Sequence, residues 1–371
     1  DMFYTAGLTG TTHEPAVPTG RISTTKSEEV AAYFDKVKEM EALPYNNLWR
    51  KNLLHVSGGI AEGEPQLFKS YMEGFQATAE DYYLGGKVSA IAKLSRELQP
   101  INVAAQVNSG LNLLTFFGHS STTALDFEIG LASDPVQGYN NKGKYPVLLM
   151  NGCNVGSIFQ RLKLLGDDWV LTKEKGAAGF IGHTAYGLSG NLKRYSDTFY
   201  SVAYGDSAFM KQGIGDIQKE TARRYMLSNF NSASNITQVQ QMILLGDPAL
   251  RLFGAPEADL EINSDNITIE SFDGQPISTL ADSFAVNLIV RNFGQARRDT
   301  IRIEVVRTLA DNSTIVYDSL YPSPKYSDTL TLIIRKGRES GFGSNTFQVT
   351  LDPDNVLPEL SEENNVANKS F

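Results

Sequence analysis

Short apolar runs alternate with amphipathic stretches over the first two thirds of the chain. These runs are bounded by Gly, Asn or Pro, as buried parallel strands are. We predict strands at residues 17–22, 53–57, 111–117, 147–150 and 177–181. Strands that alternate with helical patterns are typical of a mostly parallel sheet covered by helices. The first part of the chain is therefore predicted to be an α/β domain.

Helical spacing fills the gaps between these strands. Apolar side chains between residues 30 and 37 recur at helical spacing before Pro44, after N-cap candidates at 23–25. Further helices are predicted at residues 64–83, 169–174, 191–203 and 215–227. The sequence Leu-Leu-Gly-Asp-Pro at 244–248 is read as a turn that closes the domain, which we place at residues 1–254.

The apolar period changes to two after about residue 255. Strands are predicted at residues 259–269, 285–292, 300–308, 315–320, 329–335 and 345–351. Short strands at this density indicate an all-β, immunoglobulin-like sandwich, which we place at residues 255–371.

Length and charge agree with two domains and exclude some functions. A chain of 371 residues exceeds the usual size of one domain. Most of the net charge of -9 comes from residues 255–371, with 18 acidic and 10 basic side chains, against 24 and 23 before them. Neither part has the basic cluster that nucleic-acid binding needs, and no apolar stretch is long enough to be transmembrane. The chain starts at Asp1 without a signal-peptide pattern, which predicts a processed piece.

Candidate chemistry lies where two predicted strands end. His119 follows the strand at 111–117, and Cys153, the one cysteine, follows the strand at 147–150. Loops at the carboxyl ends of parallel strands present functional groups in one crevice. An imidazole beside a thiol favours the thiolate, which is the nucleophile, and later protonates the leaving amine. We therefore predict a nucleophilic dyad of Cys153 and His119.

Other interpretations of these residues stay open. A lone Cys is more often a small buried hydrophobe, and a His after an apolar strand is equally a buried, hydrogen-bonded imidazole. His183 also follows a strand and competes with His119 as the base. Four scattered His and one Cys offer no zinc-ligand spacing.

Four motifs, taken together, carry a family resemblance. They are Val-Pro-Thr-Gly-Arg-Ile at 17–22, Phe-Gly-His-Ser-Ser at 117–121, Asn-Gly-Cys at 151–153 and Leu-Gly-Asp-Pro-Ala-Leu-Arg-Leu at 245–252. In order and spacing, residues 1–254 resemble the gingipain-like cysteine peptidases of family C25, and within them the PorU-like sortases of the type IX secretion system.

The resemblance implies a caspase-like fold, a dyad at His119 and Cys153, and an oxyanion hole from the backbone N–H groups of Ser120 and Cys153. It implies an endopeptidase without a cofactor that acts on proteins or peptides. Gingipains cut after basic residues, whereas the sortases remove C-terminal sorting domains and pass the acyl group to a lipopolysaccharide amine. It also implies a location at the outer membrane or cell surface, or secretion.

The sequence departs from the family pattern in three places. Ser120 stands where many members have Gly, and Ala16 stands where an acid that orients the His is often found. Glu14, two residues earlier, is our substitute for that acid, beside the equal alternative of a solvated loop carboxylate. We also expect that this sequence lacks the N-terminal half of the usual family domain and holds only the catalytic subdomain.

Two acids after the histidine, Asp126 and Glu128, are candidates for binding a basic substrate side chain. The alternative is that they are exposed loop acids without a specific role. The C-terminal part resembles the CARDB module at residues 290–294, 352–360 and 362–365. Asp352, Asp354 and Glu359 are candidates for structural calcium, and a turn rich in Asp and Asn is the simpler account.

Two rival functions remain at this stage. The first is a catalytically inactive peptidase domain that serves as a surface scaffold, with the sandwich as an adhesion module. The second is an α/β hydrolase with a Ser nucleophile, which is disfavoured because the chain lacks a Gly-x-Ser-x-Gly elbow. Contact between Cys153 and His119 discriminates the enzyme from the scaffold.

Overall fold

The computed structural model describes residues 1, 4–159, 164–272, 283–335 and 343–371. The chain divides into two compact units. Unit 1 consists of Asp1–Pro44, Trp49–Asp81 and Gly86–Gly254, and unit 2 of Tyr45–Leu48, Tyr82–Gly85 and Ala255–Phe371. The predicted order of an α/β fold followed by an all-β sandwich is confirmed.

Unit 1 is built on a six-stranded sheet with the order β2-β1-β4-β6-β7-β8. The strands are β1 (Asn52–Ser57), β2 (Lys87–Ala92), β4 (Leu113–Phe117), β6 (Val147–Asn151), β7 (Gly179–His183) and β8 (Met242–Gly246). Neighbouring strands pair in parallel except β7 and β8, which are antiparallel. The small strands β3 (Gln99–Pro100) and β5 (Phe127–Glu128) form a separate pair. Because β2 lies on one side of β1 and β4 on the other, the winding reverses at β1.

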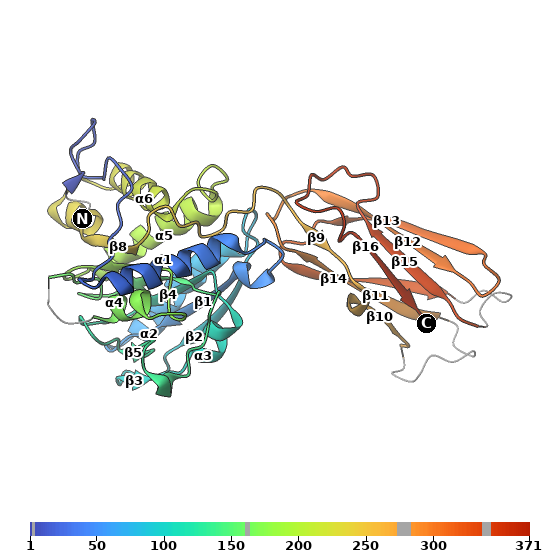
Figure 1. Ribbon diagram of the computed structural model, residues 1–371, viewed down its shortest axis with the longest axis horizontal. Helices are drawn as coiled ribbons and strands as arrows, with labels where there is room; N and C mark the ends of the chain where they lie inside the picture. Colours follow the sequence, from blue (N-terminus) through green and yellow to red (C-terminus); the bar gives the residue numbers. More distant parts are fainter. Residues whose placement is uncertain (2–3, 160–163, 273–282, 336–342) are drawn as a thin grey trace. The chain divides into compact units, whose positions relative to one another are not determined.

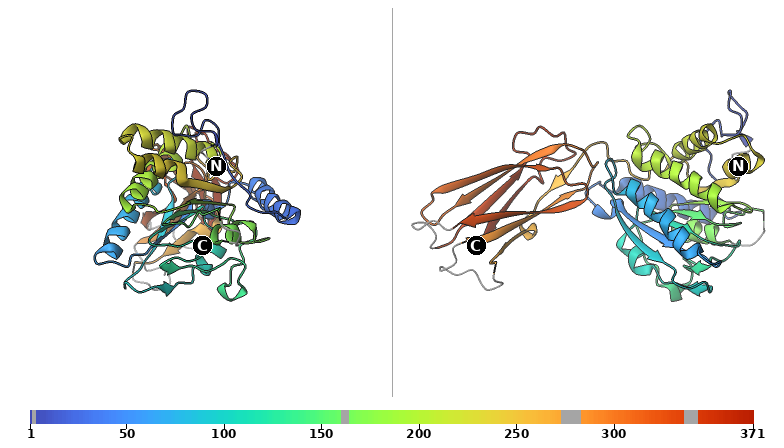
Figure 2. Two further views of the ribbon diagram at one scale, coloured as in Figure 1. Left: turned by 90° about the vertical axis from the view of Figure 1, so that its left-hand side faces the viewer. Right: turned by 180° about the vertical axis from the view of Figure 1, so that it is seen from behind.

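Helices cover both faces of this sheet (Figures 1 and 2). Their bounds are α1 (Ser27–Ala42), α2 (Glu64–Ala79), α3 (Ala104–Ser109), α4 (Leu165–Leu171), α5 (Ser189–Gly205), α6 (Ile214–Ser228) and α7 (Ala233–Gln241). Short 3-10 helices lie at Leu48–Lys51 (η2) and Pro135–Gln137 (η3). Helices α1, α3 and α4 share one core cluster with the sheet, and α2, α5 and α7 pack on the other face.

Alternation along the strands separates the two faces. Leu54 and Val56 of β1 join the cluster with α1, α3 and α4, whereas His55 points the other way and hydrogen-bonds Tyr200 of α5 through its Nε2 at 2.8 Å. Thr115 of β4 meets the same Tyr200 hydroxyl at 2.7 Å. Successive side chains of a strand point to opposite faces, so each strand is buried on both.

The structure corrects two predicted elements of unit 1 and adds a strand that the sequence analysis did not predict. Residues 17–22 form no strand; Arg21 makes one isolated bridge to Leu245 instead. The sequence read as a closing turn begins within β8, an antiparallel edge strand. Strand β2 was missed because its side chains are mostly exposed and its apolar pattern is weak.

Unit 2 is a sandwich of two antiparallel sheets. One sheet has the order β10-β11-β14 with β9 beside β11, and the other has the order β13-β12-β15-β16. The strands are β9 (Leu260–Glu261), β10 (Ile267–Glu270), β11 (Ser283–Asn292), β12 (Thr300–Thr308), β13 (Thr314–Pro322), β14 (Ser327–Arg335), β15 (Thr346–Leu351) and β16 (Val366–Ser370). A short 3-10 helix, η4 (Ser264–Asn266), precedes β10. Alternate apolar residues of both sheets, such as Val286, Val305 and Val349, form the core.

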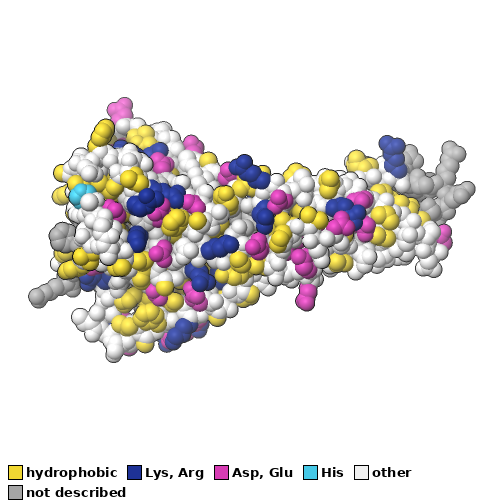
Figure 3. Space-filling view, turned by 90° about the horizontal axis from the view of Figure 1, so that it is seen from above, with side chains coloured by type: hydrophobic (Ala, Val, Ile, Leu, Met, Phe, Trp, Pro, Cys, Tyr) yellow, Lys and Arg dark blue, Asp and Glu magenta, His cyan; other side chains and the backbone are white. Residues whose placement is uncertain are grey.

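No helix in the described part of the chain has the length and apolar character needed to cross a bilayer. On the face drawn in Figure 3, Lys and Arg side chains are interspersed with Asp and Glu side chains rather than gathered in one broad basic patch.

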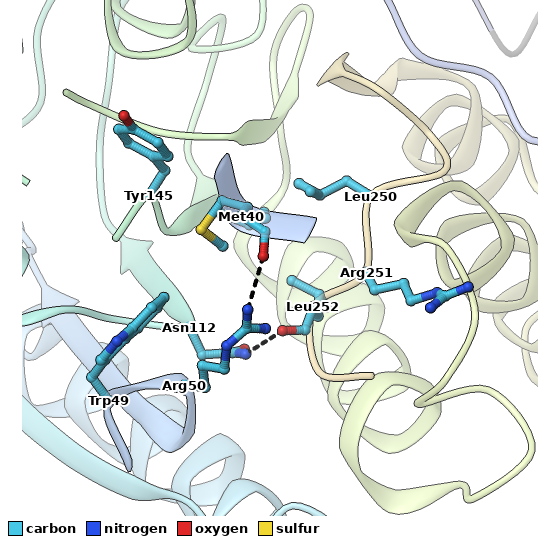
Figure 4. A pocket seen from close by; sticks show the side chains of 9 residues that line it. Met40, Trp49, Arg50, Asn112, Tyr145, Leu250, Arg251 and Leu252 are labelled. Carbon is cyan, nitrogen blue, oxygen red and sulfur yellow. Dashed lines mark hydrogen bonds between the residues drawn. The ribbon is translucent and has the colours of Figure 1, made fainter. Parts of the chain in front are cut away.

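A small pocket lies at the amino ends of β4 and β6 (Figure 4). Polar groups on its wall are tied to backbone carbonyls. Arg50 Nη2 donates to the carbonyl of Met40 at 2.8 Å, and Asn112 Nδ2 donates to that of Leu252 at 2.6 Å. These bonds fasten the chain after β8 and the end of α1 to the amino edge of the sheet.

Unit 2 holds a carboxylate cluster of Glu359, Glu362 and Asp259. Glu359 accepts hydrogen bonds from the N–H of Leu260 and from Asn365 Nδ2. Burial raises the pKa of Glu359 to about 7, and the charges of Glu362 and Asp259 add to this effect. The folded state therefore holds a proton on Glu359 more tightly than the unfolded chain does.

We predict that unit 2 loses stability as pH rises from about 4.5 to 7. When the folded-state pKa of a carboxyl group is raised, the free energy of unfolding is highest below the unfolded-state pKa and falls until the pH passes the folded-state pKa. For Glu359 we expect a total loss of about 2 kcal/mol after allowance for partial exposure. Hydrogen exchange of peptides from β11 and β15 measures this. Glu359→Gln is expected to flatten the pH dependence, and an unchanged slope would contradict the assignment.

Candidate active site

Three neighbouring strands, β1, β4 and β6, end in register at one edge of the sheet. Ser57 pairs with Phe117, and Phe117 pairs with Asn151. The ladder continues one step further, since Gly58 N donates to Phe117 O at 2.8 Å and Gly118 N donates to Asn151 O at 3.0 Å. The loops after these strands carry Glu64, His119 and Cys153, at the point where the winding reverses. In open α/β sheets this crevice is where functional groups gather.

His119 is held by a carboxylate from the neighbouring loop. Its Nε2 lies 2.8 Å from Oε2 of Glu64, the first residue of α2, and its ring lies 6.1 Å from that of Phe68. The same Oε2 accepts the N–H groups of Ile60 at 3.0 Å and Ala61 at 2.8 Å. Because a carboxylate accepts, Nε2 carries the proton and Nδ1 is the basic nitrogen of the neutral imidazole.

The ionised form of Glu64 is favoured in this loop. Partial burial tends to raise its pKa, but the N–H groups of Ala61 and Ile60, together with His119, outweigh burial and lower the pKa below its usual value. The side chains of His119 and Glu64 are 42% and 24% exposed, so the pair is open to solvent on one side. Glu64 thus presents a fixed negative charge to the imidazole.

Cys153 is half-buried, and its sulfur contacts the backbone of Gly187. Gly187 N donates to Sγ at 3.4 Å, and Sγ donates to Gly187 O at 3.6 Å. Asn154, the next residue, has a left-handed φ of 58° and donates its N–H to Ala185 O. Among the residues that the structure describes, no hydrogen bond joins Sγ to His119. The strand ends bring the two residues to adjacent loops, and the thiol is engaged by Gly187.

Asp126 is a structural residue, which corrects its predicted role in binding substrate. It is 2% exposed, and its Oδ2 lies 3.1 Å from Nζ of the equally buried Lys93. Gly59 N donates to Oδ2 at 2.6 Å, and His119 N donates to Oδ1 at 3.0 Å. The carboxylate therefore joins the loops after β1, β2 and β4. A carboxylate that is 2% exposed and paired with a buried Lys is not accessible to a substrate side chain.

The loops after β4 and β6 contact each other closely. Ser120 Oγ donates to Cys153 O at 2.8 Å. A Cβ on Gly152 would lie 2.1 Å from Ser120 Oγ, so only Gly allows this approach. In the described chain neither the N–H of Ser120 nor that of Cys153 donates a hydrogen bond.

Two further predicted site residues have other partners. Glu14 accepts the N–H of His13 and the hydroxyl of Thr12, and within the described residues it makes no hydrogen bond to His119. The carboxylate that contacts His119 is that of Glu64. Glu128 accepts the N–H groups of Leu125 at 2.7 Å and Gly130 at 2.8 Å, so both of its oxygens are engaged within its own loop.

The competing base, His183, lies in the interior. It is 1% exposed, and its Nδ1 donates to Ala185 O at 2.9 Å. Burial lowers its pKa below the usual value, although the bond to Ala185 opposes this. The structure therefore gives the open, carboxylate-paired setting to His119 rather than to His183.

The three acids proposed for calcium have separate partners. Asp352 accepts the N–H of Leu357, Asp354 pairs with Arg302, and Glu359 accepts the N–H of Leu260. Within the described residues, no group of three or more His, Cys, Asp and Glu side chains is arranged to hold a metal ion. Calcium binding stays a prediction.

Comparisons with known proteins agree with this architecture. The model of peptidase family C25 matches residues 1–253, and the CARDB model matches residues 257–369. No curated protein matches. The resemblance stated from the sequence is confirmed in both parts.

Solved structures give the same fold. The chain is similar to the Arg-specific cysteine proteinase gingipain R, with 16% identity and a TM-score of 0.59 over 100% of this chain and 78% of that one. A complex of the pro- and mature domains of Porphyromonas gingivalis RgpB gives 16% identity and a TM-score of 0.58, covering 100% and 79%. Dimeric latent PorU from the same organism gives 13% identity and a TM-score of 0.17, covering 54% and 19%, too low for a comparison of folds.

We predict that Asp126→Asn destabilises unit 1 by about 3–5 kcal/mol, because it leaves the Lys93 charge buried without its counter-charge. Denaturant unfolding followed by Trp fluorescence reports on unit 1 alone, since both tryptophans, Trp49 and Trp169, belong to it. Glu174→Gln, which breaks the exposed pair with Lys142, is the matched control and should leave the midpoint nearly unchanged. Equal effects of the two substitutions would refute the structural role of Asp126.

We also predict that Gly152→Ala forces the loops after β4 and β6 apart, at about 1–3 kcal/mol, because the new methyl group meets Ser120 Oγ. Gly74 of α2 has no atom within 4 Å of an added Cβ, so Gly74→Ala should stabilise by about 0.5–1 kcal/mol. The same unfolding experiment compares them. A neutral Gly152→Ala would show that the two loops are not in this close contact.

Proposed function

This chain belongs to peptidase family C25, and we propose that it is a cysteine peptidase with Cys153 as nucleophile, His119 as general base and Glu64 as the residue that orients the imidazole. The observation that carries the proposal is the 2.8 Å contact between Glu64 Oε2 and His119 Nε2, on the loop beside the one that bears the single cysteine. This contact leaves Nδ1 of His119 as the proton acceptor.

The first half of the reaction forms a thioester. Sγ exchanges its contact with Gly187 for one with the substrate, its proton passes to His119 Nδ1, and the sulfur attacks the carbonyl carbon of the scissile bond. The N–H groups of Ser120 and Cys153 stabilise the oxyanion of the tetrahedral intermediate. His119 then protonates the leaving amine, the C–N bond breaks, and the acyl group stays on Cys153.

The second half releases the acyl group to water or to an amine. His119 Nδ1 takes a proton from the incoming nucleophile as it attacks the thioester, and Cys153 leaves as thiolate. The resemblance to type IX sortases supports C-terminal sorting domains of secreted proteins as substrates, a lipopolysaccharide amine as acceptor, and a location at the cell surface or outside the cell. These three points are part of our proposal.

One observation favours the alternative of an inactive surface scaffold with an adhesion module. Sγ hydrogen-bonds Gly187 and, within the described residues, not His119. Catalytic hydrogen bonds often form only with substrate bound, so resting geometry does not decide between the two functions. Reactivity of the thiol decides.

We predict that iodoacetamide labels Cys153 rapidly at neutral pH, and that His119→Ala slows this labelling by about 100-fold, since general-base assistance contributes about 10²–10⁴. Glu64→Gln keeps the acceptor oxygen but removes the charge, and we expect a loss of about 10- to 100-fold from weaker orientation. Intact-protein mass spectrometry across pH gives the rates.

His183→Ala is the matched control, because it also removes an imidazole at a strand end and should leave the neutral-pH rate within about twofold if folding is kept. Labelling at the rate of a model thiol, unaffected by His119→Ala, would contradict the enzyme and favour the scaffold.

A further inference from the structure

Two large apolar side chains flank the glycine that contacts the nucleophilic sulfur. Tyr186 is 82% exposed and Leu188 is 60% exposed, and Gly187 between them bonds Sγ through both its N–H and its carbonyl. We call residues 186–188 the rim segment. Apolar side chains that stay exposed on both sides of a residue in contact with the sulfur are available for burial against a ligand.

The rim segment is fixed by its backbone. Before it, Ala185 O accepts the N–H of Asn154 at 2.8 Å. At its last residue, Leu188 O accepts the N–H groups of Asn191 and Leu192, both at 2.9 Å, in the first turn of α5. An added Cβ on Gly187 would lie 2.8 Å from Leu192 Cδ1, so the segment packs directly on this helix. The two exposed side chains therefore project from an anchored backbone.

The loop that carries the orienting carboxylate adds a third apolar side chain. Ile60 is 41% exposed, and its N–H is bonded to Glu64 Oε2, the oxygen that contacts His119. Exposed apolar side chains thus stand beside the sulfur on one loop and beside the base on another.

Carboxylates near the two reactive residues are already engaged. Asp126 is paired with buried Lys93, both oxygens of Glu128 accept backbone N–H groups, and Glu64 contacts His119. Glu62, on the loop between β1 and α2, is the exposed acid of that loop. A basic substrate side chain would find apolar surface at the rim segment rather than an unengaged carboxylate there.

We propose that Tyr186 and Leu188 form the main side-chain subsite and select peptides with a large apolar residue at the scissile carbonyl. This inference rests on the peptidase function proposed above. An apolar substrate side chain would gain free energy when it is buried against the rim segment. A charged side chain would gain less, because it must give up its hydration there.

The test uses the full chain and four peptidyl acyloxymethyl ketones that differ only in the residue next to the reactive group: Leu, Phe, Lys or Arg. The second-order rate of Cys153 labelling is measured by intact-protein mass spectrometry. We expect Leu and Phe probes to react about 10-fold or more faster than Lys and Arg probes. Leu188→Ser and Tyr186→Ser should each slow the Leu probe about 10-fold and leave iodoacetamide labelling unchanged.

Two controls accompany these variants. Leu188 is the N-cap residue of α5 without a side-chain cap, and Ser is a favoured N-cap, so Leu188→Ser keeps the helix start. Val136→Ser removes an apolar side chain that is 83% exposed, in η3, whose C-cap residue Gly138 hydrogen-bonds Asn108 of α3. It should change neither rate.

Faster labelling by the Lys and Arg probes, reversed by Glu62→Gln, would overturn the proposal and assign the subsite to Glu62. Equal rates for all four probes, or equal slowing of the ketone and iodoacetamide by the rim variants, would overturn it as well. The His119→Ala comparison with iodoacetamide is a separate readout, and its failure contradicts the dyad and not the measured preference among probes.

Discussion

The buried pair of Asp126 and Lys93 is the interaction on which the candidate site depends. Asp126 takes one hydrogen bond from the loop after β1, through Gly59, and one from the loop after β4, through His119, while Lys93 follows β2. Gly58 and Gly118 lie so close to the carboxylate that a Cβ on either would come within 2.4 Å of Oδ1. A charge without water must be matched by fixed partners, and the partners here are the loops themselves.

On this foundation the site combines two kinds of support. Side chains hold the imidazole, since Glu64 contacts Nε2 and Phe68 lies beside the ring. Main-chain groups hold the sulfur, through Gly187, and the turn after it, through Ala185. Charge therefore positions the imidazole and backbone geometry positions the thiol. The contact of Ser120 Oγ with Cys153 O joins the two halves beyond the pairing of β4 with β6.

The strand ends that carry His119 and Cys153 could be predicted from the sequence, but the carboxylates that contact His119 could not. His119 and Cys153 were found because apolar strands followed by Gly mark the carboxyl edge of a parallel sheet. Glu64 was missed because it is the first residue of a helix whose loop becomes relevant only when β1 is known to lie beside β4. Its available signal was an acid after a predicted strand and the Gly pair at 58–59. Asp126 was misread because its burial depends on Lys93, which is 33 residues away in the chain.

If the proposed subsite is right, the rim segment would make specificity separable from catalysis. The hydrogen bonds described for residues 185–188 use backbone atoms, apart from those made by the thiol and by His183. Side chains at positions 186 and 188 can be exchanged without removing any of these bonds. Point substitutions at these two positions would therefore change substrate specificity while the reacting atoms stay in place. Related chains with the same nucleophile could then diverge quickly in the peptides they cleave.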